Sequence, residues 1–364
     1  MSGDAAWLAA FWEENRLCEG KPFRTDKPRA PVSMHFDDHF LMGLVPYSVV
    51  RYHSDAAYQE EVHRQANDIL EAELGRRFYP EIVCPVHPKR IEFVFGAWFE
   101  IHEGSTPWLA NDVRTIDDVR RLIDRVEREP IDERLLPEGW EAEVRRFEER
   151  SGGKVAWGTG GRGPVTVGTS VLGAENLCLW MVEQPETIGE FYSLLARKYV
   201  EWARFLRDLS GFKGSGWWVT DDDSCLISRE LYEQFCEPVL RALFEAFAPG
   251  PDDRRYQHSD SAMGHLMPVL RRLGVNGVNL GPTIHPADIR AALPEAVIEG
   301  QIPPFLLRNG TEAEIRACVR RDFEAAGLEG GLVCTPAGSY AEGTPFENLR
   351  AYLRAVQELT RYDR

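Results

Sequence analysis

The sequence predicts an α/β fold, namely a (β/α)8 TIM barrel with an N-terminal helical extension and an insertion after the second strand. Two observations predict this class. Eight short apolar runs alternate along the chain with amphipathic helical patterns, as buried parallel strands alternate with the helices that cover them. No Gly-x-Gly-x-x-Gly motif follows the first run, which disfavours a doubly wound dinucleotide-binding sheet.

Most of the predicted strands contain Val or Ile and are bounded by Gly, Pro or Asp, which commonly end strands. The third run can be extended as far as Thr166. In chain order the eight runs are Pro31–Phe36, Glu81–Pro85, Lys154–Thr159, Ser215–Thr220, Arg254–His258, Gly274–Leu280, Ala296–Gln301 and Gly330–Cys334.

Helical patterns fill the intervals between these runs. Pro185–Leu209 begins with a proline, which suits a first helical turn, and repeats apolar residues at nearly helical spacing. Pro238 is expected to kink the helix Leu231–Phe247 or to start a new one. The other predicted helices are Asp55–Leu74, Ile116–Glu127, Ile315–Ala326 after a capping box at Thr311, and Pro345–Leu359.

The 364 residues are predicted to form a single barrel domain, because 43% of them are hydrophobic, which is ample for one large core. Residues 1–30 form the N-terminal extension. Residues 86–153 are predicted to be an insertion, since they contain the hairpin pattern Ile91–Ile101 and the charged helix Ile116–Glu127.

The charge balance excludes two classes of partner. The chain has 42 basic and 58 acidic residues and a net charge of −16, whereas nucleic acids and anionic membranes need a basic surface. Seven cysteines without a Cys-x-x-Cys pair indicate free thiols in a reducing cytoplasm. Neither a signal peptide nor a long apolar span is visible, so we expect a cytoplasmic protein. We also expect a monomer or a homodimer.

Polar residues at two strand ends form the leading candidate site. His258 and Asp260 share a face because side chains alternate along an extended chain. Cys334 ends the last strand, and the strand ends of a barrel converge on one pocket, so His258, Asp260 and Cys334 are candidate metal ligands. The alternatives are that Asp260 caps a helix, that His258 lines the pocket through hydrogen bonds, and that Cys334 is a small core residue.

Two acidic segments also follow predicted strands. In Thr220-Asp221-Asp222-Asp223-Ser224 adjacent side chains point apart, and we select Asp222 as the one that faces the pocket. In His35-Phe36-Asp37-Asp38-His39 the residues His35, Asp37 and His39 share one side if the chain stays extended. The alternatives are a solvated turn and a polar loop. The candidate catalytic residues are His258, Asp222, Asp37 and His35.

The candidate substrate-binding residues are basic or aromatic. Arg162 lies in the glycine-rich segment Gly158–Pro164, where a substrate can approach the backbone and the guanidinium can hold a carboxylate. This segment lacks the Lys-Ser/Thr of a phosphate-binding loop. The full set is Arg162, Trp218, Tyr340 and His39.

The order of several motifs resembles the uroporphyrinogen decarboxylase superfamily, which includes cobalamin-linked methyltransferases that act on thiols. The resemblance extends from about Pro31 to the C-terminus and implies a TIM barrel with its pocket at the strand ends. It rests on Phe95-Gly96-Ala97-Trp98, Gly163-Pro164-Val165-Thr166, Asp222-Asp223, His258-Ser259-Asp260 and Gly343-Thr344-Pro345-Phe346-Glu347-Asn348.

The departures from the family pattern bear on function. The decarboxylases carry an arginine-rich signature after the first strand, where this chain has the acidic segment Met34–His39. The zinc methyltransferases use His-x-Cys and a late Cys. Here His258 matches, Asp260 stands in for the first Cys, and the late position falls near Gly338, four residues after Cys334. A carboxylate ligand makes the site harder than a thiolate would.

The resemblance implies a metal-assisted transferase of methyl or other small groups, nearer the methyltransferase branch than the true decarboxylases. Zinc would be held by His258, Asp260 and Cys334, and the methyl group would come from a small molecule or a corrinoid on a partner protein. The resemblance alone implies that partner, because the chain has no Asp-x-His-x-x-Gly motif. The alternatives are a metal-free decarboxylase or lyase on a small non-porphyrin substrate, and a non-catalytic ligand-binding barrel.

Overall fold

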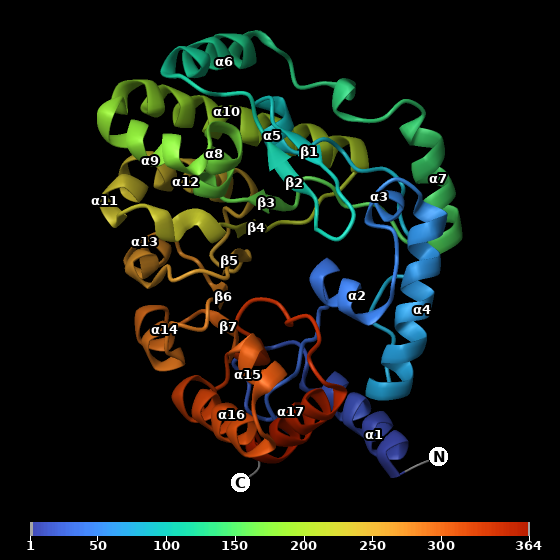
Figure 1. The fold of residues 1–364 in the computed structure, drawn as a ribbon. Helices are drawn as coiled ribbons and strands as arrows, with labels where there is room; N and C mark the ends of the chain where they lie inside the picture. Colours follow the sequence, from blue (N-terminus) through green and yellow to red (C-terminus); the bar gives the residue numbers. More distant parts are fainter. Residues whose placement is uncertain (1–2, 363–364) are drawn as a thin grey trace. The chain divides into compact units, whose positions relative to one another are not determined.

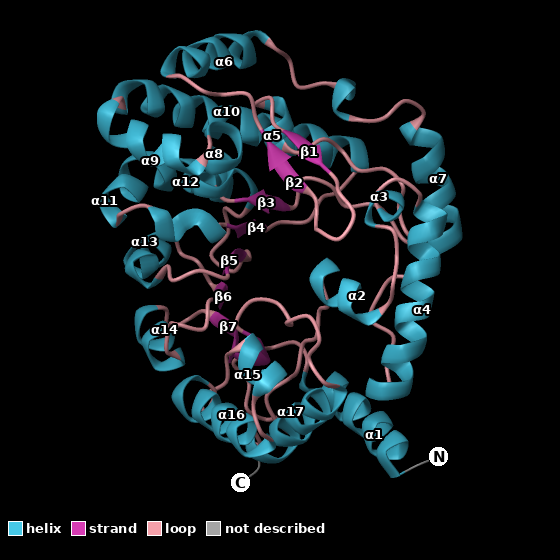
Figure 2. Ribbon diagram, in the orientation of Figure 1, coloured by secondary structure: helices cyan, strands magenta, loops and turns pink. Residues whose placement is uncertain are grey.

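The protein has an α/β fold in a computed structural model that describes residues 3–362. Six strands form a sheet in the order β3-β4-β5-β6-β7-β8, and β1 and β2 form a separate antiparallel pair (magenta in Figure 2). The pairs β3–β4, β4–β5, β6–β7 and β7–β8 are parallel. The α/β class with a parallel sheet is therefore confirmed, whereas the closure of this sheet into a barrel stays a prediction.

The chain divides into two compact units. Figure 1 labels the helices and strands of both. Among the described residues, the first unit comprises residues 3–81, 259–267 and 276–362. Its elements are α1 (Gly3–Cys18), α2 (Asp38–Leu44), α3 (Val49–Tyr52), α4 (Ala56–Leu74), the 3-10 turn Gly264–Leu266, β6 (Gly277–Leu280), α14 (Pro286–Ala292), β7 (Val297–Ile302), α15 (Pro304–Asn309), α16 (Glu312–Ala326), β8 (Leu332–Pro336) and α17 (Phe346–Leu359).

The second unit comprises residues 82–258 and 268–275. Two elements contain residues of both units, namely β5 (Arg255–Ser259) and α13 (Met267–Arg272). The remaining elements are α5 (Ile91–Val94), β1 (Trp98–Glu100), β2 (Trp108–Ala110), α6 (Ile116–Arg128), the 3-10 turn Glu133–Leu135, α7 (Trp140–Ser151), β3 (Gly160–Arg162), α8 (Pro164–Leu172), α9 (Ala174–Glu183), α10 (Pro185–Ser210), β4 (Trp217–Thr220), the 3-10 turn Asp222–Leu226, α11 (Arg229–Leu231), a π-helix at Tyr232–Cys236 and α12 (Glu237–Phe247).

The first two predicted strands are wrong. The run Pro31–Phe36 makes only the single parallel bridge Val32–Cys334, and Glu81–Pro85 forms no strand. Prolines at 31, 80, 85 and 88 lack the N–H group that a ladder needs, so these runs form no regular ladder.

The third predicted strand lies a few residues too early. The strand is Gly160–Arg162 in place of Lys154–Thr159, so it lies within the extension to Thr166, but that extension overruns it because α8 begins at Pro164. Glycines occupy β3 for a packing reason. A Cβ atom on Gly160 or Gly161 would lie under 3.0 Å from the Trp218 ring or from the Tyr199 hydroxyl. The five later runs all contain strands, displaced by three residues or fewer at either end.

Local end signals placed the helices well. Asp55 accepts a hydrogen bond from the Tyr58 N–H at the start of α4, and Thr311 forms the predicted capping box with Glu314. The predicted break at Pro238 is confirmed, because a π-helix ends at Cys236 and α12 starts with Pro238 in its first turn. The predicted hairpin Ile91–Ile101 is displaced, since Ile91–Val94 is helical and the hairpin strands are β1 and β2.

Long-range hydrogen bonds fix the framework within each unit. In the first unit the fully buried Arg29 forms an ion pair with Glu14, at 2.7 Å, and donates to Asn15 Oδ1. In the second unit the Trp202 indole N–H donates to the Lys89 carbonyl oxygen at 2.9 Å, which ties α10 to the segment before α5.

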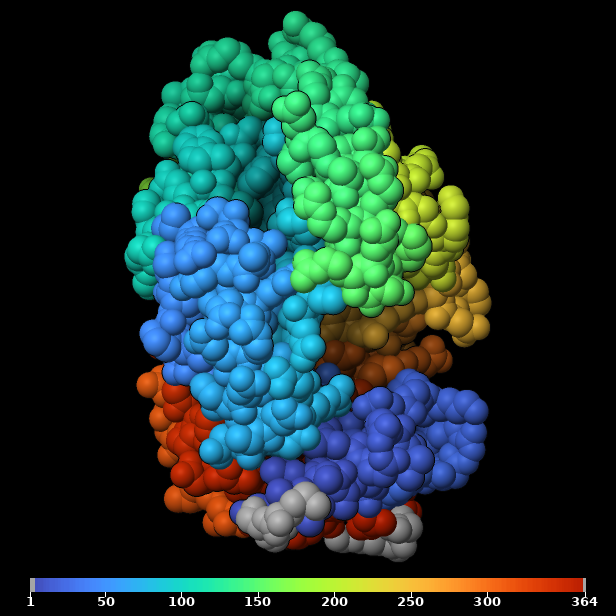
Figure 3. Space-filling view, turned by 90° about the vertical axis from the view of Figure 1, so that its right-hand side faces the viewer, coloured from blue at the N-terminus to red at the C-terminus, as the bar shows by residue number. Residues whose placement is uncertain are grey.

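Figure 3 shows the outer surface of helix α7, which belongs to the second unit.

Among residues 3–362, none of the individual helices is both long and apolar enough to cross a membrane. Helices α8 and α9 meet that criterion only as a pair, which is bent by 104°. The cytoplasmic location stays a prediction.

Candidate metal centre

The carboxyl ends of β4 and β5 place the leading candidate residues. Thr220 on β4 pairs in register with His258 on β5, and the Asp221 N–H donates to the His258 carbonyl oxygen at 3.0 Å. Because polar groups at the carboxyl ends of neighbouring parallel strands lie at one edge of a sheet, the residues after Thr220 start beside His258.

Hydrogen bonds to helix α8 distinguish Asp221 and Asp223 from Asp222, which lies between them. Asp221 is fully buried, and its Oδ1 accepts a hydrogen bond from the Thr166 N–H at 2.8 Å. Asp223 accepts a hydrogen bond from the Thr169 hydroxyl, and its own N–H donates to Thr166 Oγ1 at 3.2 Å. With its two neighbours held on α8, Asp222 is the aspartate that joins His258.

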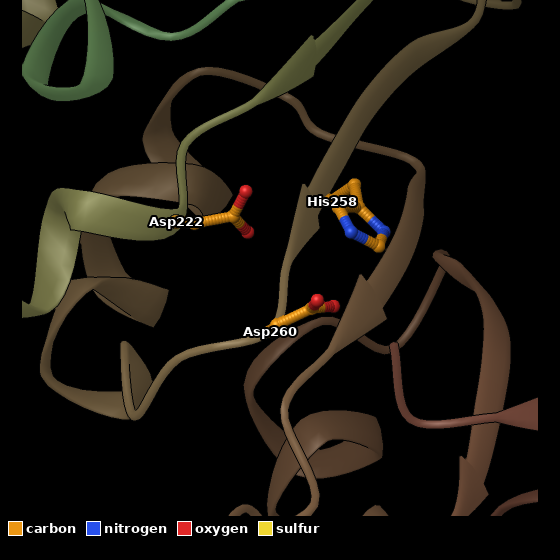
Figure 4. A group of neighbouring side chains, drawn as sticks. All are labelled: Asp222, His258 and Asp260. Atoms are coloured by element: carbon orange, nitrogen blue, oxygen red, sulfur yellow. The ribbon is translucent and has the colours of Figure 1, made fainter. Parts of the chain in front are cut away.

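Asp222, His258 and Asp260 form one group of potential metal ligands (Figure 4). Each offers one ligand atom, and these atoms all lie within 4.8 Å of one another. His258 is half-buried and Asp260 is exposed, so the group is accessible to solvent. The predicted neighbours His258 and Asp260 therefore meet Asp222, which was predicted to be catalytic.

The donor set of this group suits a divalent ion. Carboxylate oxygen and imidazole nitrogen both bind zinc at about 2.0–2.2 Å, which leaves positions open for water or substrate. Two ligands of one tetrahedral ion at those distances are about 3.3–3.6 Å apart, so the three side chains would have to move inward to bind one ion together. Two oxygens and one nitrogen form a harder set than thiolates and suit zinc, cobalt or manganese.

Arg162 and Trp218 lie on the same face of the sheet as His258. Arg162 and His258 both pair with Thr220, and Trp218 lies two residues earlier on β4. Arg162 donates to the Ser170 hydroxyl at 3.1 Å and lies 3.5 Å from the buried Glu92 carboxylate. Trp218 is 43% exposed, with one face of its indole over Gly160. These two predicted substrate-binding residues thus place a charged group and an aromatic group on the face of the sheet that carries His258.

Cys334 and Tyr340 are buried members of the first unit. Burial raises the pKa of the Cys334 thiol to about 12, so a thiolate is disfavoured at neutral pH. Tyr340 packs its ring against Phe36, with centroids 4.8 Å apart. The group of three ligands described above does not include Cys334, and its role as a ligand stays a prediction.

The segment His35–His39 does not remain extended, and the expected alternation along one side is wrong. Asp37 is the N-cap of α2, and its Oδ1 accepts a hydrogen bond from the Phe40 N–H at 3.0 Å. The helix starts at Asp38 because such a cap satisfies an N–H that would otherwise lack a partner. His35 and His39 are exposed. The catalytic roles of His35 and Asp37 stay predictions.

Asp221 and Gly338 also lie at the candidate metal centre, and the sequence analysis assigned neither of them a role there. Burial raises the pKa of the Asp221 carboxyl to about 7, although the Thr166 hydrogen bond opposes that shift. Gly338 packs directly against the Asp260 carboxylate. The run of three aspartates marked Asp221 in the sequence, but nothing local distinguished it from its neighbours.

A cavity of about 640 Å³ lies elsewhere in the second unit. It is lined by α7, by residues 154–156 and by residues 208–213 after α10. None of the candidate site residues lines it, so we do not assign the reaction to it.

The fold and the ligand group define an α/β protein with a candidate metal centre at the carboxyl ends of parallel strands. This chain belongs to the uroporphyrinogen decarboxylase (URO-D) family, whose sequence pattern matches residues 90–359. The resemblance found in the motifs is thereby confirmed.

The chain is similar to a curated methyltransferase in sequence and to a solved methyltransferase in fold. The methylated-thiol–coenzyme M methyltransferase of Methanosarcina mazei is 28% identical over 218 residues, which are 55% of this chain and 53% of that protein. The chain thus matches about half the length of this curated relative. A solved structure, a methyltransferase from Methanosarcina mazei, superposes with a TM-score of 0.62 at 15% identity, over 96% of this chain and 98% of that one. This likeness shows a shared fold.

Proposed function

We propose that this protein is a metal-assisted transferase of methyl or other small groups. The observation that carries the proposal is the group Asp222, His258 and Asp260, whose ligand atoms lie within 4.8 Å of one another at the ends of β4 and β5. The methyltransferase names of the relatives support the reaction class. A bound divalent ion would supply Lewis-acid activation of a thiol or hydroxyl acceptor.

The chain's own residues have separate tasks in this proposal. Asp222, His258 and Asp260 would hold the ion, with His258 neutral so that a ring nitrogen could bind. Arg162 binds an anionic group of the small-molecule substrate, and its guanidinium geometry suits a carboxylate. Trp218 provides an apolar surface on the same face of the sheet, two residues before the β4 residue that pairs with His258. The methyl donor or acceptor is a corrinoid on a partner protein, as in the cobalamin-linked branch that the motifs resemble.

Metal content is expected to decide this proposal. Protein purified without chelator at about pH 8 should carry a bound divalent ion, chiefly zinc, and should lose turnover when a strong chelator removes it. Because an ordinary histidine gains a proton near pH 6.5, metal affinity and turnover should fall together below that pH. Elemental analysis and turnover, measured across this pH range with and without added zinc, test both expectations. Metal-free protein that is fully active in chelator would instead favour the decarboxylase or lyase.

The protein should not decarboxylate uroporphyrinogen at an enzymatic rate. Its His35–His39 segment is acidic, and like charges about 4 Å apart repel by about 1 kcal/mol even with water-like screening. The assay separates porphyrinogen products by chromatography, with a true uroporphyrinogen decarboxylase as the positive control. Stepwise loss of substrate carboxylates at a comparable rate would contradict this expectation.

A further inference from the structure

The carboxylate of Asp260 occupies space that is open only because residue 338 is a glycine. A Cβ atom built on Gly338 would lie 2.9 Å from Asp260 Cγ and closer still to Oδ1, whereas real Cβ contacts stay beyond 3.0 Å. Gly338 also has a φ of +99°, which residues with a side chain rarely adopt. Both residues belong to the first unit, so their packing is internal to that unit.

A buried asparagine fixes the position of Gly338. Asn279 on β6 accepts a hydrogen bond from the Gly338 N–H at 3.0 Å. Its Nδ2 donates to the carbonyl oxygens of Glu299 and Pro336, at 2.5 Å and 2.8 Å. One side chain therefore ties the loop after β8 to β7 and to the end of β8. Gly338 cannot easily retreat from Asp260, because the movement would break its hydrogen bond to the buried Asn279 side chain.

The main chain of Asp260 packs against a second glycine, Gly281. A Cβ atom on Gly281 would lie 2.5 Å from the Asp260 carbonyl oxygen and 2.7 Å from that of Ser261. The backbone of Asp260 thus packs on Gly281 while its carboxylate packs on Gly338. The direction of this side chain is set by its surroundings, although the residue is exposed.

We propose that Gly338 is a positioning residue for Asp260, and that the loop fixed by Asn279 holds the Asp260 carboxylate where it joins Asp222 and His258. This inference rests on the proposed metal centre. A side chain at 338 would push the carboxylate out of the group and remove one ligand oxygen. The pair Gly338 and Asp260 therefore decides whether the centre has two carboxylates or one.

The test compares two glycine substitutions. Gly338→Ala should weaken binding of Co²⁺, measured by its visible absorption during titration, by about tenfold or more, since lost support for a ligand costs about 10–100-fold in metal affinity. Gly343→Ala is the matched control. Gly343 also has a positive φ, of +70°, but its nearest neighbouring atom is 4.0 Å away. This control should bind Co²⁺ as wild type does.

A double substitution separates positioning from a general loss of structure. In an Asp260→Ala background the carboxylate is absent, so Gly338→Ala should weaken Co²⁺ binding no further. Equal weakening in both backgrounds, or binding by Gly338→Ala as tight as by Gly343→Ala, would overturn the proposal.

Crystal structures of the metal-free wild type and of Gly338→Ala give a second measurement that needs no ion. We expect the Asp260 carboxylate to be displaced in the variant. If wild type binds no Co²⁺, the proposed function fails, and these structures still decide the positioning role. An unmoved carboxylate refutes that role whatever the ion does.

Discussion

Replacing His258 with alanine is expected to lower both Co²⁺ affinity and turnover by more than about hundredfold, because loss of a supporting contact alone costs up to that factor. His258 supplies the single nitrogen of the ligand group, and Asp222 and Asp260 supply oxygens. Stability should change by only about 1 kcal/mol, since the side chain is half-buried and lies outside the hydrophobic core. The hydrogen bond from the Asp221 N–H goes to the main chain of residue 258 and survives the substitution.

The matched control is His102→Ala, because the side chain of His102 is 69% exposed and lies 3.7 Å from Glu100 on the β1–β2 hairpin. Metal titration, turnover and denaturant unfolding are measured on both variants. Full turnover by His258→Ala on the native substrate would show that this histidine is structural. A large loss of stability would show the same and would invalidate the activity comparison.

Replacing Asp221 with asparagine should abolish a large pH dependence of stability. Burial raises the pKa of the Asp221 carboxyl to about 7 in the folded state, from 3.8 in the unfolded chain. Between about pH 4 and pH 7 the unfolded chain has lost this proton and the folded protein keeps it. The free energy of unfolding therefore falls as pH rises through this window, by up to about 4 kcal/mol for three pKa units.

Asparagine resembles the protonated acid. Its carbonyl oxygen can still accept from the Thr166 N–H, and its amide can donate where the Tyr232 hydroxyl, 3.4 Å from Oδ2, now donates. Asp221→Asn should equal wild type near pH 4 and exceed its stability at pH 8. Denaturant unfolding in chelator, which keeps both proteins free of metal, measures the difference at each pH. The exposed Asp252→Asn is the control, and parallel curves for wild type and Asp221→Asn would contradict the expectation.

The sequence identified the later strands because their signals are local. From Ser215 onward each run carries its own apolar residues and end signals, and β4 to β8 form there. The first two runs failed for a reason that is not local. Their apolar content matches that of a strand. Strand formation, however, also needs main-chain N–H groups that can pair with a neighbouring strand, and the prolines in and beside these runs have none.

The sequence by itself determined the family, the α/β class and the pairing of His258 with Asp260, since a spacing of two residues places both on one face of an extended chain. Only the tertiary structure decided which aspartate joins them. Thr166 and Thr169 of α8 bind Asp221 and Asp223, and they lie more than 50 positions away in the chain. Likewise the space for the Asp260 carboxylate depends on Gly338, which is remote in sequence. Side-chain direction at such sites is set by hydrogen bonds and steric contacts between distant segments, and spacing along the chain does not encode them.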